Sequence, residues 1–141
     1  MRPVVMRRQK PSGEAEQKYQ ADVAFGARRA ELLAAAREAE SQLRKAEARR
    51  APVTELHRLA LDLDAALTEA VRAAFSAMRV AIGPRGYDDS IYRRKMRATA
   101  PVHALIAEAE HLLTLRETHR LNGIPPVPRE LSPLASPVTS A

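Results

Sequence analysis

Residues 49–56 read Arg-Arg-Ala-Pro-Val-Thr-Glu-Leu, and this short stretch decides how the chain folds. Proline disfavours helical backbone at the residue before it, but it fits comfortably in the first turn of a new helix. Pro52 therefore ends one helix and opens a second one. The sequence predicts that two long helices fold back on each other here as an antiparallel hairpin.

The residues before this turn predict one long helix over 13–50. Ser12 is a suitable N-cap, and Glu14 and Glu16 place negative charge in the first turn. Apolar residues then recur at intervals of three, four or seven, which is the spacing of a coiled-coil seam. The seam consists of Phe25, Leu32, Ala36, Ala39, Leu43 and Ala46. Only Gly26 interrupts a pattern that otherwise favours continuous helix.

The residues after the turn predict a second helix over 54–82. Its apolar residues form two adjoining stripes, so we expect this helix to be buried on two sides and to be the central member of the bundle. Gly83-Pro84 ends it, as a glycine followed by a proline commonly does at a helix C-terminus.

Two further helices are predicted beyond that end. A short basic one covers 90–98, with Ile91 and Met96 as its apolar anchors, and a longer one with its own apolar stripe covers 100–122. We therefore expect an all-α fold, an elongated helical hairpin or three-helix bundle over residues 12–123.

Segments of different composition flank the helical part. Residues 1–11 are basic and bounded by prolines, which predicts a flexible arm. Residues 124–141 hold half of the ten prolines and predict a polyproline-like or disordered tail. This tail either is a solvated end or docks in a groove of a neighbouring molecule. Its apolar side chains, which we expect to make that contact, are Ile124, Val127, Leu131 and Leu134.

The composition indicates a thin hydrophobic core. Hydrophobic residues make up 45% of the chain, but alanine is the commonest of them, and there are only three tyrosines, two phenylalanines and no tryptophan. Alanine favours helix strongly but buries little area. We therefore expect part of the stability to come from copies of the chain or from other partners.

The net charge of +6 is concentrated in two places, the N-terminal arm and the segment around residues 85–97. Basic patches on a nearly neutral body indicate an anionic partner, nucleic acid first, although such charge is also typical of a merely solvated surface. We expect sequence-independent contacts to a DNA or RNA backbone. The residues expected to make them are Arg7, Arg8, Lys10, Arg85, Arg93, Arg94, Lys95 and Arg97. Tyr87 and Tyr92 flank the second patch and either stack on bases or brace the turn.

The residues that carry catalysis are largely missing. The absence of cysteine excludes disulfides and thiolate metal sites. Glu108 and His111 have the Glu-x-x-His spacing of a di-iron bundle, with His103, Glu110 and His119 nearby, but such a site needs a second motif on a facing helix. The predicted helix over 54–82 has no such motif. We therefore expect no metal, no cofactor and no enzymatic activity.

The chain contains no apolar stretch long enough to span a membrane. Its N-terminus also lacks the apolar run of a secretory signal. We expect the protein in the cytoplasm or in the interior of a virion, with no membrane partner.

The two long helices joined at Arg49-Arg50-Ala51-Pro52-Val53-Thr54-Glu55-Leu56, with a return helix that closes at Met78 to Pro84, resemble the helical oligomerisation core of phage terminase small subunits. The resemblance covers roughly residues 14–113. In that family the hairpin helices pack into a ring, and a C-terminal segment contacts the large subunit. The family usually carries an N-terminal helix-turn-helix, and this sequence has only the basic arm in its place.

The resemblance implies that residues 124–141 contact a packaging motor. It also implies that five leucines lie in or near the ring interface, and Phe25 joins them as the first residue of the seam. The expected oligomer interface is thus Phe25, Leu32, Leu43, Leu56, Leu63 and Leu67.

Three functions remain open at this stage. The first is a homo-oligomeric assembly protein of the DNA-packaging or virion-structural kind. The second is a helical nucleic-acid-binding subunit of a ribonucleoprotein complex, and the third is a small helical inhibitor or adaptor of one protein target. These differ in the mass expected in solution with and without nucleic acid.

Overall fold

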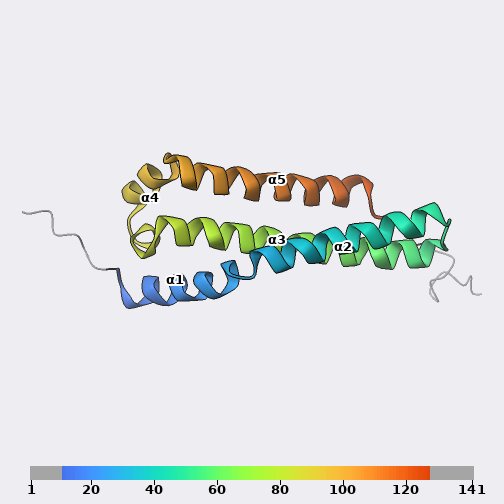
Figure 1. Ribbon diagram of the computed structural model, residues 1–141, viewed down its shortest axis with the longest axis horizontal. Helices are drawn as coiled ribbons and strands as arrows, with labels where there is room; N and C mark the ends of the chain where they lie inside the picture. The colour runs from blue at the N-terminus through green and yellow to red at the C-terminus, as the bar shows by residue number, and fades with distance from the viewer. Residues whose placement is uncertain (1–10, 128–141) are drawn as a thin grey trace, which may run out of the picture.

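The computed structural model describes residues 11–127, which form a series of helices joined by short turns (Figure 1). The helices are α1 (Gly13–Gly26), α2 (Arg29–Ala48), α3 (Val53–Ile82), the 3-10 helix η1 (Pro84–Tyr87), α4 (Ser90–Arg97) and α5 (Ala100–Asn122). No strand occurs between residues 11 and 127, and the expectation of an all-α fold is confirmed.

α3 is the central helix of the structure. α2 and α5 each pack along it, and α1 packs against its C-terminal half, while α2 and α5 make little contact with each other (Figure 1). The chain reverses between α2 and α3 at Arg50-Ala51-Pro52, where Arg50 has a φ of 55°. The Ala51 N–H donates to the Ala46 carbonyl at 3.0 Å and closes the end of α2.

The core lies along α3 and consists mainly of leucine and alanine. Its main cluster is Ala36, Leu43, Ala60, Leu63, Leu67, Ala70, Val71, Ala74, Ala109 and Leu112. Leu43, at 1% exposed, is the largest side chain that is almost completely buried. A smaller cluster of Met78, Ile82, Val102 and Ile106 joins α3 to α5 near α4. The small size of alanine makes this core thin.

The predicted continuous helix over 13–50 is wrong at one point, because the chain leaves the helix at Ala27 and Arg28. Gly26 supplies the physical reason. A Cβ atom there would lie 3.1 Å from the backbone nitrogen of Ala77, so the missing side chain lets α1 approach the α3 backbone closely. Glycine also costs a helix interior about 1 kcal/mol relative to alanine. The resulting bend allows both α1 and α2 to follow α3.

The predicted helices over 54–82, 90–98 and 100–122 agree with α3, α4 and α5 to within one residue at each end. The prediction that Ile91 anchors this helix is wrong, because its side chain is 80% exposed. Tyr92 and Met96, four residues apart on one face of α4, pack against the smaller cluster instead.

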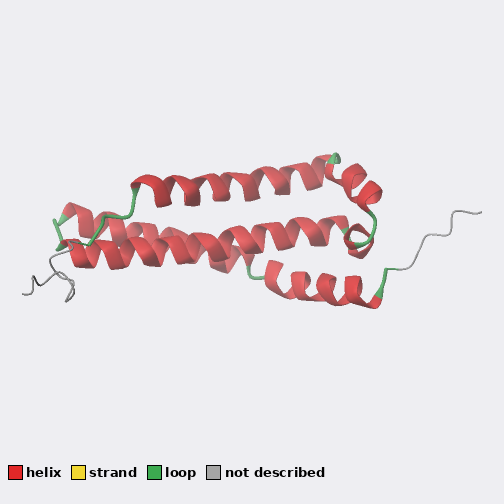
Figure 2. Ribbon diagram, turned by 180° about the vertical axis from the view of Figure 1, so that it is seen from behind, coloured by secondary structure: helices red, strands yellow, loops and turns green. Residues whose placement is uncertain are grey.

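The described chain ends close to the turn between α2 and α3. Residues 123–127 run from the end of α5 toward that turn, as Figure 2 shows from behind. Ile124 packs against the main core cluster, and the Nδ1–H of His57 donates to the Pro125 carbonyl at 2.6 Å. The two ends of the described chain therefore lie at opposite ends of the molecule (Figure 1).

Candidate nucleic-acid interface

A polar cluster around Asp22 holds the end of the molecule that carries α4. The Asp22 carboxylate of α1 accepts hydrogen bonds from Ser76 at 2.8 Å and from Arg79 at 2.8 Å, both on α3. It also accepts one from the hydroxyl of Tyr87 in η1. One carboxylate thus ties α1, α3 and η1 together.

The charges in this cluster reinforce each other. Burial alone would raise the pKa of Asp22, but the hydrogen bonds from Arg79, Tyr87 and Ser76 outweigh it and hold the pKa below its ordinary value of 3.8. Burial, followed by the hydrogen bond to Asp22, raises the pKa of Tyr87 above its ordinary value of 10.0. Asp22 is therefore ionised and Tyr87 neutral at neutral pH. No periodic pattern marks Asp22, and reasoning from the sequence did not find it.

The beginning of α1 is hydrogen-bonded to the segment that precedes α4. The Ser12 N–H donates to Oδ2 of Asp88 at 2.7 Å, and the Ser12 hydroxyl donates to Oδ1 at 3.3 Å. The Ser12 hydroxyl also accepts from the Ala15 N–H at 3.0 Å, which confirms the predicted N-cap. Residues 1–10 are therefore attached to the described chain at the same end as α4, and Lys10 is only two residues from Ser12.

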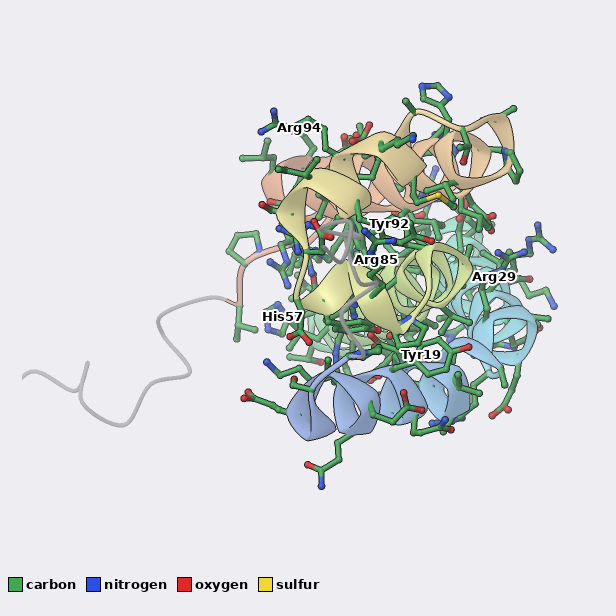
Figure 3. The ribbon with its side chains drawn as sticks, turned by 90° about the vertical axis from the view of Figure 1, so that its left-hand side faces the viewer. Tyr19, Arg29, His57, Arg85, Tyr92 and Arg94 are labelled. Atoms are coloured by element: carbon green, nitrogen blue, oxygen red, sulfur yellow. The ribbon has the colours of Figure 1, made fainter. Side chains whose placement is uncertain are left out.

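Arg85 and the two tyrosines brace the turn before α4. The Asp89 side chain caps α4 by accepting from the Tyr92 N–H at 2.9 Å. Arg85 donates to Asp89 at 3.2 Å, and its guanidinium carbon lies 4.5 Å from the centre of the Tyr92 ring (Figure 3). Arg85 was expected to contact nucleic acid, but the structure pairs its charge within the chain. Of the two roles predicted for Tyr92, stacking on bases or bracing the turn, the structure shows the second. The Tyr87 hydroxyl donates a hydrogen bond to Asp22.

The cations of α4 differ from those of α3 and α5. Every arginine of α3 and α5 forms an ion pair with a carboxylate, namely Arg58, Arg72, Arg79, Arg116 and Arg120. In contrast, Arg94, Lys95 and Arg97 form no ion pair within residues 11–127, and Arg93 donates to the Gly86 carbonyl at 2.8 Å. All four side chains are exposed, and Arg94 projects away from the bundle in Figure 3.

Three of these cations surround a shallow depression on the surface of α4. Ser90, Arg93, Arg94 and Arg97 line a space of about 280 Å³, because positions three and four apart fall on one helix face. Guanidinium groups donate in a planar fork that matches phosphate oxygens. The depression is therefore suited to an anionic group of that kind.

Part of the expected interface lies outside the described residues. Arg7, Arg8 and Lys10 of the arm, and Leu131 and Leu134 of the tail, belong to this part of the chain. In the tail's described portion, Ile124 contacts the chain's own core, and Val127 is exposed.

The leucines expected in an oligomer interface lie inside the core of the single chain. Leu32, Leu43, Leu63 and Leu67 are between 1% and 8% exposed and pack within their own chain. Leu56 is half-buried against the same core. The half-buried ring of Phe25 lies 5.0 Å from the guanidinium carbon of Arg72. The seam therefore faces α3 of its own chain.

Two of the residues with metal-ligand spacing, His119 and Glu108, have partners within the chain. The buried ring of His119 donates from Nε2 to the Ala60 carbonyl at 2.7 Å, and Glu108 pairs with Arg29 at 3.5 Å. Within residues 11–127, no group of three or more potential ligands is gathered so that it could hold a metal ion. No helix in that part of the chain is both long enough and apolar enough to span a membrane.

Comparison with models of known protein families, with curated proteins and with solved structures finds no match for this chain. Function is therefore inferred from the geometry and charge of its own residues.

Proposed function

We propose that this protein is a non-catalytic, homo-oligomeric assembly protein, of the DNA-packaging or virion-structural kind, which binds the backbone of nucleic acid through its α4 end. The observation that carries the proposal is the contrast in ion pairing. The arginines of α3 and α5 all have carboxylate partners, whereas Arg94, Lys95 and Arg97 of α4 have none within the described chain.

An unpaired cation gains more from a phosphate than a paired one does, because no existing ion pair has to be broken. Binding to nucleic acid also releases condensed counterions, which gives the interaction its strength and its salt dependence. The attachment of residues 1–10 beside Asp88 supports an interface at the α4 end of the molecule. Arg7, Arg8 and Lys10 precede Ser12 by only two to five residues, so they are close along the chain to the point that contacts Asp88. Fully extended, ten residues reach roughly 35 Å.

The assembly part of the proposal is supported by the thin core and by an apolar residue left at the surface of α5. Leu115 is 43% exposed. The resemblance of the hairpin to terminase small subunits favours packaging among the assembly roles.

The test of nucleic-acid binding is the triple variant Arg94→Ala/Lys95→Ala/Arg97→Ala. All three side chains are exposed and unpaired, so the fold should be retained. Fluorescence anisotropy with a labelled DNA duplex across a salt series should give weaker binding. The slope of log affinity against log salt should become shallower by up to about 2.7, at about 0.9 for each lost phosphate contact.

The matched control removes three other cations that form no ion pair within the described chain, two on α2 and one in the turn after it. It is Arg37→Ala/Lys45→Ala/Arg50→Gly, in which glycine suits the φ of 55° at position 50. It has the same net charge as the test variant and should bind nearly as well as the wild type. Equal losses in both variants would show that net charge alone governs binding, and the α4 interface would be rejected.

Light scattering with and without nucleic acid tests the assembly part. A defined oligomer in the absence of nucleic acid is the expected result. A monomer whose mass increases only with nucleic acid would instead favour the ribonucleoprotein subunit, and a monomer indifferent to it would favour the inhibitor or adaptor.

A further inference from the structure

An apolar groove runs between α2 and α5, with α3 as its floor. It consists of two adjoining cavities of about 500 and 340 Å³, which share Glu40, Leu67 and Leu115 in their walls. The groove stays open because α2 and α5 each pack on α3 but make little contact with each other. Figure 1 shows α5 and α1 on opposite sides of α3.

The groove has the character of a docking surface. Leu56, Leu63 and Leu67 form its floor, and the half-exposed Leu115 projects from the α5 wall. Its α2 wall extends from position 33 to position 47, which corresponds to about 21 Å of helix at 1.5 Å per residue. Concave apolar surfaces of this kind commonly bind a partner.

The sequence after α5 has a pattern that fits such a groove. From position 125 to position 137, every third residue is a proline or a leucine: Pro125, Pro128, Leu131, Leu134 and Pro137. A polyproline II helix has three residues per turn and rises about 3.1 Å per residue, so these residues would share one face. The stretch from Pro128 to Leu134 would then span about 19 Å, close to the length of the groove. Pro125, the first residue of the pattern, already lines the groove in its own chain.

The chain passes one end of its own groove as it leaves α5. Gly123 and Pro125 line that end, and residues 123–127 run toward the turn between α2 and α3 (Figure 2). The cavities extend the other way, toward Leu33 and Glu108. Ile124 in the core and the His57–Pro125 hydrogen bond fix the direction of residues 123–127. The described chain therefore leaves its own groove at the end lined by Glu47 and Leu56, which favours the groove of a second copy for the residues after Val127.

We propose that residues 128–141 of one copy dock in the α2–α5 groove of a second copy, with Leu131 and Leu134 in the leucine-lined cavities. Arg129 and Glu130 bring charges of both signs to an α2 rim on which Glu40, Arg44 and Glu47 alternate in sign. The proposal rests on the assembly part of the proposed function and is independent of nucleic-acid binding.

Disulfide trapping tests the contact directly, because the chain contains no cysteine of its own. Thr118→Cys places a thiol on the α5 wall, and Ser132→Cys places one between the two tail leucines. Copies of different mass that carry one change each should form a mixed disulfide under mild oxidation. Glu14→Cys, on α1 at the opposite end of the molecule, is the control partner for Ser132→Cys and should form much less of it.

Two results of this trapping experiment would overturn the proposal. One is a mixed disulfide no more abundant than with the Glu14→Cys control. The other is a disulfide that forms only within a single chain when both cysteines are placed in it and the protein is diluted, because the tail would then occupy its own groove.

Charge substitution gives an independent measurement in the full chain. Leu115→Asp on the groove wall and Leu131→Asp in the tail should each raise at least tenfold the concentration at which the oligomer dissociates. Leu121→Asp is the matched control, since Leu121 is an exposed leucine of α5 that does not line the groove. Circular dichroism checks that all three variants remain helical.

The outcomes separate this inference from the proposed function. If the wild type is a monomer, the assembly part of the proposed function fails together with the tail contact. If a stable oligomer is unaffected by both Leu115→Asp and Leu131→Asp, only the tail contact is overturned. Neither result changes the comparison between the two triple variants in nucleic-acid binding.

Discussion

α1 and α2 lie end to end along α3, but different forces hold them there. α2 buries Leu32, Ala36, Leu43 and Ala46 against α3, whereas Ala15 is the one residue of α1 that is buried to the same degree. α1 depends instead on the carboxylate of Asp22 and on the close approach of Gly26. Apolar burial is insensitive to pH, but a carboxylate cluster is not, so the two helices should respond differently to the same perturbation.

The largest expected effect is on the α2 side of this comparison. Leu43→Ala should lower the free energy of unfolding by about 3 kcal/mol or more, because it opens a cavity at a side chain that is only 1% exposed. Urea denaturation followed by circular dichroism measures the loss. Leu61→Ala, at a leucine of α3 that is 46% exposed, should cost less than about 1 kcal/mol. Similar losses in both variants would contradict the burial described for Leu43.

The corresponding test of α1 is Asp22→Ala. It removes the shared acceptor of Arg79, Ser76 and Tyr87, and should cost about 2 kcal/mol. Amide hydrogen exchange should show that α1 loses protection first, while α2 keeps most of its own. Asp62→Ala, which removes an exposed pair with Arg58, is the control and should cost about 0.5 kcal/mol or less. Equal loss of protection in α1 and α2 would mean that Asp22 does not hold α1 specifically.

A smaller effect is expected at the bend between α1 and α2. Gly26→Ala gains helix propensity, but its Cβ would lie 3.1 Å from the Ala77 nitrogen. A backbone atom in the middle of a long helix can move only slightly to relieve this contact. We expect a net loss of up to about 1 kcal/mol in thermal unfolding. Gly13→Ala has open space around the new methyl group and should be neutral or slightly stabilising. A stabilised Gly26→Ala variant would show that the bend tolerates a side chain.

The smallest effect is a dependence of stability on pH that belongs to the Asp22 cluster. Since the pKa of Asp22 is lowered, its contribution is full above pH 3.8 and is lost as the pH falls through the lower folded value. Since the pKa of Tyr87 is raised, its contribution is full below pH 10.0 and is lost as the pH rises further. The stability difference between the wild type and Asp22→Asn should therefore be constant at neutral pH and shrink in acid. A difference that stays constant down to pH 2 would contradict the lowered pKa.

The elements could be predicted from the sequence where local chemistry decides the structure. Pro52 and Gly83 mark helix ends because one restricts the backbone and the other, with its φ of 98°, permits what other residues rarely adopt. The bend at Gly26 depends instead on how closely α1 approaches Ala77, a distant part of the chain. The cluster around Asp22 likewise depends on tertiary contacts. A single aspartate in a helix does not indicate in the sequence which distant residues it will contact.

The seam of α2 shows a different limit. Heptad spacing identifies the face of a helix that is buried, but not whether the partner belongs to the same chain or to another copy. Leu32 and Leu43 are buried, as the spacing predicts, and the structure packs their helix against α3 of the same chain. At the candidate site, the basic run that ends at Arg97 was visible in the sequence. The pairing of Arg85 with Asp89 was also readable there, from their spacing of four residues around the turn.

The hydrogen bonds between Ser12 and Asp88 hold the beginning of α1, to which residues 1–10 are attached, against the segment before α4. If α4 engages a polyanion as proposed, a cation on so short a linker is present at millimolar effective concentration. Arg7, Arg8 and Lys10 can therefore add to the overall avidity even if the arm alone has no measurable affinity. Asp88→Ala loosens the tether but also removes one negative charge, so Asp62→Ala, which removes one negative charge on α3, is its control. Asp88→Ala should bind a polyanion more weakly than Asp62→Ala does.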